Sequence, residues 1–145
     1  MRSTVSKAQS AHKGDLVTKL RAVGLRPTRQ RIALGKLLFA DCDRHVTAES
    51  LHQEATRVGA SLSLATVYNT LHQFTGAGLL RKVIVNGKKT YFDTNTNDHH
   101  HFYYEDRGLL ADIPGDDVRI DGLPKPPSGT EIERVEVVVR LKSRD

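Results

Sequence analysis

Apolar residues in the first half of the chain recur every three or four positions, which is the spacing of amphipathic helices. Each apolar run follows a residue that can cap a helix N-terminus. The four caps are Asp15, Thr28, Thr47 and Ser63. Gly24, Gly59 and Gly76 can end the first, third and fourth helices, and the polar stretch 41–45 breaks the second. The pattern therefore predicts four helices in the first 80 residues.

The fourth predicted helix has an apolar stripe on one face and polar side chains on the other. Leu64, Val67, Leu71 and Phe74 are spaced three, four and three residues apart, so they share the buried face. The opposite face carries short or planar side chains that can reach the edges of DNA bases. These side chains are Ala65, Thr66, Asn69, His72 and Gln73, with Tyr68 at the border. This helix is the predicted reader helix.

A hairpin signal follows the helices. Residues 83–85 and 90–92 flank Asn86 and Gly87, the pair preferred in a two-residue type I′ turn. The lysines around this turn are Lys82, Lys88 and Lys89. Three helices followed by a basic hairpin is the order of a winged helix-turn-helix, so residues 15–92 are predicted to form a DNA-binding domain.

The remainder of the chain predicts a second, smaller module after a polar hinge at residues 93–98. Residues 99–104 contain only His, Phe and Tyr and are typical of a strand, whereas residues 114–130 are rich in Pro, Gly and Asp and indicate a loop. Residues 134–141 alternate in polarity and predict a half-buried strand. So small a module has little core of its own, and pairing with a second copy would bury its sheet.

Charge is divided in the same way along the 145 residues. Residues 1–92 contain 15 Lys and Arg against five Asp and Glu, whereas residues 93–145 contain seven against twelve. A basic first module favours a polyanionic partner, and double-stranded DNA is favoured over a membrane because no basic amphipathic helix with aromatic anchors is present. The polar residues 1–14 predict a disordered tail and no secretion signal, so we expect a cytoplasmic protein.

The polar helix face and the basic positions together give a predicted contact surface for DNA. Tyr68 and Asn69 are expected to contact bases, because an Asn side chain can bond adenine with two hydrogen bonds. Arginines before and within the second helix, with the lysines of the hairpin, are expected to hold phosphates or to enter a narrow minor groove. The predicted DNA-binding residues are Arg26, Arg29, Arg31, Ser63, Thr66, Tyr68, Asn69, Gln73, Lys88 and Lys89.

Three consecutive histidines at the start of the second module indicate a ligand site. On a strand, His99 and His101 face one side and His100 the other. Two imidazoles one residue apart, with Asp93 and Asp112 as oxygen donors, suit Fe, Mn or Zn. Haem is the alternative, because the adjoining aromatic residues offer an apolar wall beside the axial donors. Cys42 is the single cysteine, so no zinc site built from two or more cysteines can form.

Residues 24–31 (GLRPTRQR), 65–71 (ATVYNTL) and the histidine-rich hinge resemble the ferric uptake regulator (Fur) superfamily. Residues 63–74 (SLATVYNTLHQF), followed by TYFD and HHHF, are similar to its iron response regulator (Irr) branch, and the resemblance covers about residues 15–141. It implies a homodimeric transcription factor of the α+β class. Its winged helix is followed by a small α/β dimerisation and ligand-sensing domain at 99–145, and it binds AT-rich inverted repeats.

The resemblance also implies a regulatory metal, whose ligands map onto His45, Asp93, His99, His101 and Asp112, where the family often has Glu in place of the Asp residues. His45 enters only in this way, because nothing in its local sequence marks it as a ligand. Two family features are missing. No cysteines stand at Tyr104 and Arg107, where the first pair of a structural zinc site would fall, and Cys42 is followed by Asp43 rather than by the proline of a haem motif.

Three functions follow as alternatives. The branch resemblance implies a regulator of iron homeostasis, a repressor that is active at low iron and released from DNA by haem bound at His99, His100 and His101. A Fur-like regulator that senses Mn, Fe or Zn directly at the hinge site is the second. A His-ligated metalloenzyme is the third, but the sequence offers no convincing catalytic base. We therefore expect a DNA-binding homodimer, or a higher oligomer, that is not an enzyme.

Overall fold

A computed structural model describes residues 15–87 and 89–144 of the chain. The predictions for the 1–14 tail and for Lys88 lie outside these residues. The chain divides into two compact units, and the boundary lies between Thr96 and Asn97. None of the helices in the described part has the length and apolar character needed to cross a membrane.

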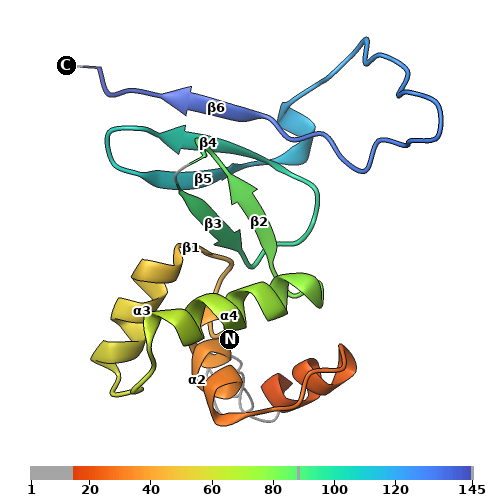
Figure 1. Cartoon of the computed structure of the whole chain (residues 1–145). Helices are drawn as coiled ribbons and strands as arrows, with labels where there is room; N and C mark the ends of the chain where they lie inside the picture. The colour runs from red at the N-terminus through yellow and green to blue at the C-terminus, as the bar shows by residue number, and fades with distance from the viewer. Residues whose placement is uncertain (1–14, 88, 145) are drawn as a thin grey trace, which may run out of the picture. The chain divides into compact units, whose positions relative to one another are not determined.

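Three helices of the first unit begin directly after their predicted caps (Figure 1), whereas Asp15, predicted to cap the first helix, is itself helical and is the first residue that the structure describes. Residues 15–22 are helical, and they are followed by α2 (Arg29–Leu38), α3 (Ala48–Arg57) and α4 (Leu64–Gly76). Thr28, Thr47 and Ser63 each accept a hydrogen bond from the backbone N–H three residues later, which confirms all three caps. Gly24 adopts a φ of +79°, which explains how the chain turns away after the first helical segment.

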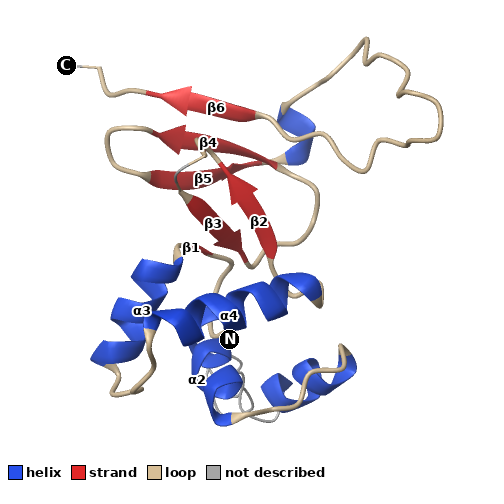
Figure 2. Cartoon of the chain, viewed as in Figure 1, coloured by secondary structure: helices blue, strands red, loops and turns tan. Residues whose placement is uncertain are grey.

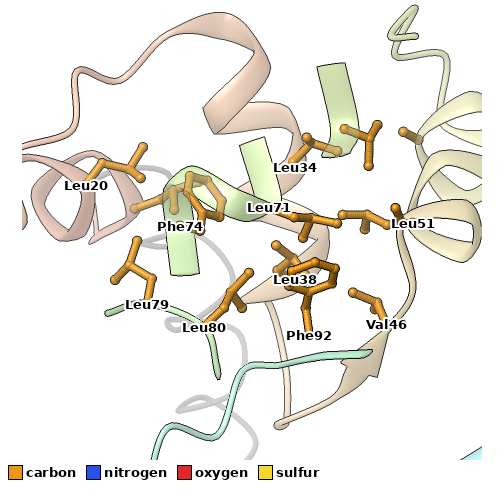
Figure 3. Close-up of a cluster of buried hydrophobic side chains, with 14 residues drawn as sticks. Leu20, Leu34, Leu38, Val46, Leu51, Leu71, Phe74, Leu79, Leu80 and Phe92 are labelled. Atoms are coloured by element: carbon orange, nitrogen blue, oxygen red, sulfur yellow. The ribbon is translucent and has the colours of Figure 1, made fainter. Parts of the chain in front are cut away.

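The core of the first unit is made by the apolar faces of these helices (Figure 3). Its completely or almost completely buried members include Leu20, Leu34, Leu38, Leu51, Val67, Leu71, Phe74 and Phe92. Leu64 differs from the prediction, since this first residue of α4 is 39% exposed. Thr70 is buried instead, because its hydroxyl donates to the Thr66 carbonyl at 2.8 Å and so loses no hydrogen bond on burial.

A three-stranded antiparallel sheet completes the first unit (Figure 2). Its order is β1 (His45–Val46), β3 (Thr90–Asp93), β2 (Arg81–Ile84), so β3 is the central strand. The sequence does not predict β1, because two residues are too short to show a polarity period. This strand takes His45 out of the predicted loop and pairs it with β3.

The turn of the basic hairpin is longer than the predicted two-residue turn. The last paired residues are Ile84 and Thr90, so five residues form the loop. Gly87 has a φ of +54°, but Asn86 does not have a positive φ, so the pair cannot form a type I′ turn. The Asn86 side chain instead accepts a hydrogen bond from the Lys89 backbone at 3.3 Å.

The second unit contains a three-stranded mixed sheet in the order β5 (Leu109–Ile113), β4 (His100–Tyr104), β6 (Val138–Leu141). β4 and β6 run parallel, and the segment that joins β5 to β6 has only a short 3-10 turn, η1 (Gly115–Asp117), as helical structure. Of the strand predicted at 134–141, only the second half, Val138–Leu141, forms a strand. The mixed α+β fold class is confirmed.

Candidate functional site

The first unit brings together a histidine and a carboxylate that are far apart in the sequence. His45 on β1 lies directly opposite Asp93 on β3. The His45 Nε2 is 3.1 Å from the Asp93 Oδ2, and the Asp93 side chain is completely buried. The other oxygen, Oδ1, accepts a hydrogen bond from the Asn95 backbone at 2.9 Å. Asp93 is therefore fixed in orientation, with one oxygen held by the backbone and the other turned towards His45.

Arg44 and Thr94 hold this pair in place from the adjacent positions of both strands. The Thr94 N–H donates to the Arg44 carbonyl at 3.0 Å, and the Arg44 N–H donates to the Thr94 hydroxyl at 2.8 Å. The Arg44 guanidinium binds both carboxylate oxygens of Glu54 on α3 and also the Leu37 carbonyl near the end of α2. The ligand-bearing strands are thus tied to two helices.

Arg81 on β2 is a residue that the sequence analysis missed. It is buried and lies opposite Asp93, on the side away from β1. Directly opposed residues of antiparallel strands share a face, so His45, Asp93 and Arg81 form one row across the sheet. No sequence signal marked it, because Arg81 lies just before the predicted strand at 83–85 and only the register of β2 with β3 brings it opposite Asp93.

The second unit assembles His99, His101 and Asp112. Asp112 on β5 lies opposite His101 on β4, and the His99 and His101 rings face the same side, with centroids 4.5 Å apart. The Asp112 Oδ1 is 3.2 Å from the His99 Nε2 and 3.6 Å from the His101 Nε2. Both histidines are buried, whereas the Asp112 side chain is 34% exposed. The predicted alternation of the histidines is confirmed.

The chemistry of these donors fits a divalent metal ion. Ligand atoms held 2.0–2.1 Å from one zinc in a tetrahedron lie about 3.3 Å apart. The His45–Asp93, His99–Asp112 and His101–Asp112 separations of 3.1, 3.2 and 3.6 Å lie close to this value. Two imidazoles with carboxylate oxygens and no thiolate suit Zn, Fe or Mn.

The hydrogen bond of His99 supports the same conclusion. Its Nδ1 contacts the Asn97 carbonyl, which can only accept, so the ring proton lies on Nδ1. This leaves Nε2 as the ring nitrogen that faces the Asp112 carboxylate. A shared cation satisfies both groups, and a backbone carbonyl on the far nitrogen is the usual way to orient a metal-binding imidazole.

His100 is placed differently from the other two histidines. Its Nδ1 accepts a hydrogen bond from the Val137 backbone at 3.0 Å, just before β6. This contact fixes the ring and leaves Nε2 as the atom that can bind a ligand. His100 therefore helps to hold β6, on the side of the strand away from the pair formed by His99 and His101.

The predicted DNA-contact residues lie on the first unit with different degrees of exposure. Tyr68 and Asn69 on α4 are exposed, as are Arg26, Arg29 and Lys89. The Ser63 hydroxyl caps α4 and donates to the Thr66 hydroxyl at 2.9 Å, so both hydroxyls already have a partner within the helix start.

Arg31 and Gln73 join α2 to the exposed face of α4. The Arg31 guanidinium donates twice to the Gln73 Oε1, at 3.3 and 3.1 Å, and once to the Arg26 carbonyl at 2.9 Å. Both side chains line an open surface pocket of about 270 Å³, together with Thr28, Gln30, Thr66, Asn69 and Thr70. The Gln73 Oε1 thus already accepts hydrogen bonds from Arg31. The side-chain N–H groups of Gln73 are the ones that can donate to an acceptor on DNA.

Comparison with known proteins identifies relatives over most of the chain. A model described as the ferric uptake regulator family matches residues 22–126. A peroxide-responsive repressor of Staphylococcus saprophyticus is 34% identical over 99 residues, which are 68% of this chain and 66% of the relative. One from Staphylococcus aureus strain Mu50 is 31% identical over 97 residues, with shares of 67% and 65%. The chain thus spans just under two thirds of the length of these relatives.

Solved structures share the fold. The ferric uptake regulator of Pseudomonas aeruginosa with manganese superposes with a TM-score of 0.68 at 24% identity, covering 90% of this chain and 98% of that one. The ferric uptake regulator of Vibrio cholerae gives a TM-score of 0.69 at 23% identity, with 88% and 98% covered.

Proposed function

Because the chain belongs to the ferric uptake regulator family, we propose that it is a metal-responsive transcriptional regulator that binds double-stranded DNA as a homodimer. The observation that carries the proposal is the pair of ligand groups, each with donor atoms at the separation expected around one ion. We propose that the protein acts in the cytoplasm, because that is where its DNA partner would be found.

We propose that the regulatory metal is held by His45, Asp93, His99, His101 and Asp112. Each offers one nitrogen or oxygen ligand atom, and three of the five are buried. The metal would supply a positive charge that binds several of these side chains at once and so fixes the distances between them. The residues do the rest: Asn97 orients His99, Asn95 orients Asp93, and Arg44 holds the strand that carries His45. Fe, Mn and Zn all suit this donor set.

DNA recognition is assigned to α4 and the basic residues around it. We propose that Tyr68 and Asn69 contact base edges in the major groove and that Arg26, Arg29 and Lys89 contact phosphates. Lys88 belongs to the proposed phosphate contacts through its position in the sequence. A dimer presents two reader helices to the two halves of an inverted repeat, so an AT-rich palindrome is the proposed operator.

Release by haem is the second candidate function. It rests on the resemblance of residues 63–74 and 99–102 to the iron response regulator branch. In this form the protein represses genes at low iron and leaves DNA when haem binds at His99, His100 and His101. Because His100 faces away from His99 and His101, either His100 or the other two histidines would hold the haem, but not all three together. The proposed metal ligands His99 and His101 would then be shared by the two effectors.

Fluorescence anisotropy of an AT-rich inverted-repeat duplex tests these proposals. The purified protein is titrated onto the duplex after metal depletion, and then with Mn, Fe, Zn or haem. Binding that requires a divalent ion supports the direct metal sensor, and binding lost on adding haem to a metal-depleted sample supports the second candidate. Binding that is indifferent to all four contradicts both.

Dimerisation and the enzyme alternative have separate tests. Sedimentation should give twice the chain mass of 16.1 kDa. A metalloenzyme needs an open coordination position and a positioned base. Hydrolytic turnover that is lost in His99→Ala would establish that alternative, and we expect no such turnover.

A further inference from the structure

Three aromatic rings connect the exposed face of α4 with the central strand of the first sheet. Tyr68 and His72 lie one helical turn apart, with ring centroids 5.6 Å apart and a 26° angle between the ring planes. His72 meets Phe92 on β3 at 5.8 Å and 88°, which is an edge-to-face contact. Both distances lie in the range of attractive ring pairs. Two of the three rings are exposed, whereas Phe92 is completely buried.

Phe92 is also the residue next to the proposed ligand Asp93. It pairs with Val46 on β1, and the adjacent pair on the same two strands is Asp93 with His45. Successive residues of a strand point to opposite faces, so β3 carries the Asp93 carboxylate on one face and the Phe92 ring on the other. Figure 3 shows Phe92 beside Leu38 and Val46 in the core. One strand therefore connects the ligand pair with the ring contact on α4.

Movement of this strand would be transmitted to α4. Binding of one ion by His45 and Asp93 constrains the separation and angle of two opposed residues on β1 and β3. Phe92 is closely packed, and packed interiors transmit a shift rather than absorb it. His72 covers Phe92 and stacks on Tyr68, so a shift of the Phe92 ring changes the surface on which Tyr68 rests.

We propose that His72 is a positioning residue that couples metal binding at His45 and Asp93 to the orientation of Tyr68 on the DNA-contacting face. The inference rests on the proposed function, since it takes both the ligand pair and Tyr68 from it. Coupling through His72 requires the two metal states to differ in how Phe92 contacts the ring, because a contact that is the same in both states shifts no equilibrium. The ring shape of His72 carries the effect, and its charge is not required.

The test uses the full chain labelled with 3-fluorotyrosine and fluorine NMR, with Zn²⁺ as a diamagnetic probe. The four tyrosine resonances are assigned with single Tyr→Phe variants. Zinc binding is measured in parallel by competition with a chelator. In the wild type and in His72→Phe, zinc should shift the Tyr68 resonance. In His72→Ala the zinc affinity should be retained while the Tyr68 shift is lost.

A second measurement follows the consequence for DNA. Coupling between two ligands usually changes an affinity by about 5- to 150-fold. The ratio of the duplex Kd without zinc to that with zinc should lie in this range for the wild type and for His72→Phe, and should fall towards one for His72→Ala. A structural role alone would weaken DNA binding in both metal states and leave the ratio unchanged.

The outcomes separate the inference from the function on which it rests. Zinc binding with a Tyr68 resonance that stays in place in the wild type overturns the coupling through His72 and leaves the metal site intact. An equal Tyr68 shift in His72→Ala overturns it as well. Absence of zinc binding in the wild type overturns the proposed function, and the coupling with it.

Discussion

Asp93 is both a proposed metal ligand and part of the central strand of the first sheet. It is the last residue of the central strand, it lies between His45 and Arg81, and its two oxygens have different neighbours. Burial of a carboxylate is costly unless charges and hydrogen bonds compensate for it. The Asp93 carboxylate has such compensation from Asn95 and His45, and its buried position beside a histidine makes it a candidate ligand for a cation.

Replacing Asp93 with Asn tests its part in metal binding. The amide keeps the size and the oxygen that accepts from Asn95, but it lacks the negative charge that favours a cation. We expect the Kd for zinc, measured by chelator competition, to rise by more than about 10- to 100-fold, since even groups that only support a ligand cost this much. Asp41→Asn, in the exposed turn before β1, is the matched control and should leave the Kd unchanged. Equal effects of the two variants would remove Asp93 from the site.

Individual residues differed in how well they could be predicted. The candidate ligands at 99–101 could be predicted from the local sequence, because strand alternation alone puts His99 and His101 on one side. His45 could not be found locally, because its place depends on a two-residue strand paired with a segment 48 positions away. Arg81 was missed because no rule of spacing links it to Asp93, and only the register of β2 with β3 does so.

The helices were predictable because capping is a local interaction. Thr28, Thr47 and Ser63 each bond to a backbone N–H three residues away, so the sequence contains both partners. The strands were harder to predict. β1 and β5 depend on neighbours across the sheet, and the hairpin does not have the predicted type I′ turn, since Asn86 lacks the positive φ that this turn requires. Such features depend on tertiary pairing, which no local pattern records.

Helix packing makes opposite predictions for two helical glycines. A Cβ at Gly35 on α2 would lie 2.7 Å from the Cδ1 and 2.9 Å from the Cδ2 of Leu16, whereas a Cβ at Gly76 on α4 meets nothing within 4 Å. Leu16 is buried in the core, so it has little room to move. We expect Gly35→Ala to lower the free energy of unfolding by about 1–3 kcal/mol through overpacking.

Gly76→Ala should raise the free energy of unfolding by up to about 1 kcal/mol, because Ala favours the helix. Urea denaturation measures both effects. Adding Leu16→Ala should cost less in the Gly35→Ala background than in the wild type, since the clash is then relieved. Stabilisation by Gly35→Ala would show that the first helical segment does not pack tightly on α2.

For the whole molecule, the distribution of charge along the chain matches the proposed functions of its two parts, with the basic part binding DNA. The first 92 residues carry a net charge of +10 from their 15 basic and five acidic residues. The remaining 53 residues carry a net charge of −5 from seven basic and twelve acidic residues. A phosphate backbone is attracted by the basic part through counterion release, which depends on salt and not on sequence. Base contacts from α4 must then supply the specificity.

Two substitutions separate these contributions to DNA binding. Lys89→Ala should weaken binding to all duplexes alike and lower the slope of log K against log salt by about one. Asn69→Ala should leave that slope unchanged and lose about 1–3 kcal/mol of discrimination between the operator and a duplex with a changed base pair. Anisotropy titrations at several salt concentrations measure both quantities. The same uniform loss in the two variants would mean that α4 is not the reader helix.

The segment between β5 and β6 has a consequence for how the second unit is held together. It runs from residue 114 to 137 and is mostly irregular, and it returns the chain to a four-residue parallel pairing between β6 and β4. As a covalent tether, it keeps β6 at an effective concentration in the millimolar range beside β4. Loop-closure entropy grows only with the logarithm of length, so doubling the tether costs about 0.6 kcal/mol. A single cut in it would remove this tether and leave β6 held by its pairing with β4 and by side-chain contacts such as that of His100 with the Val137 backbone.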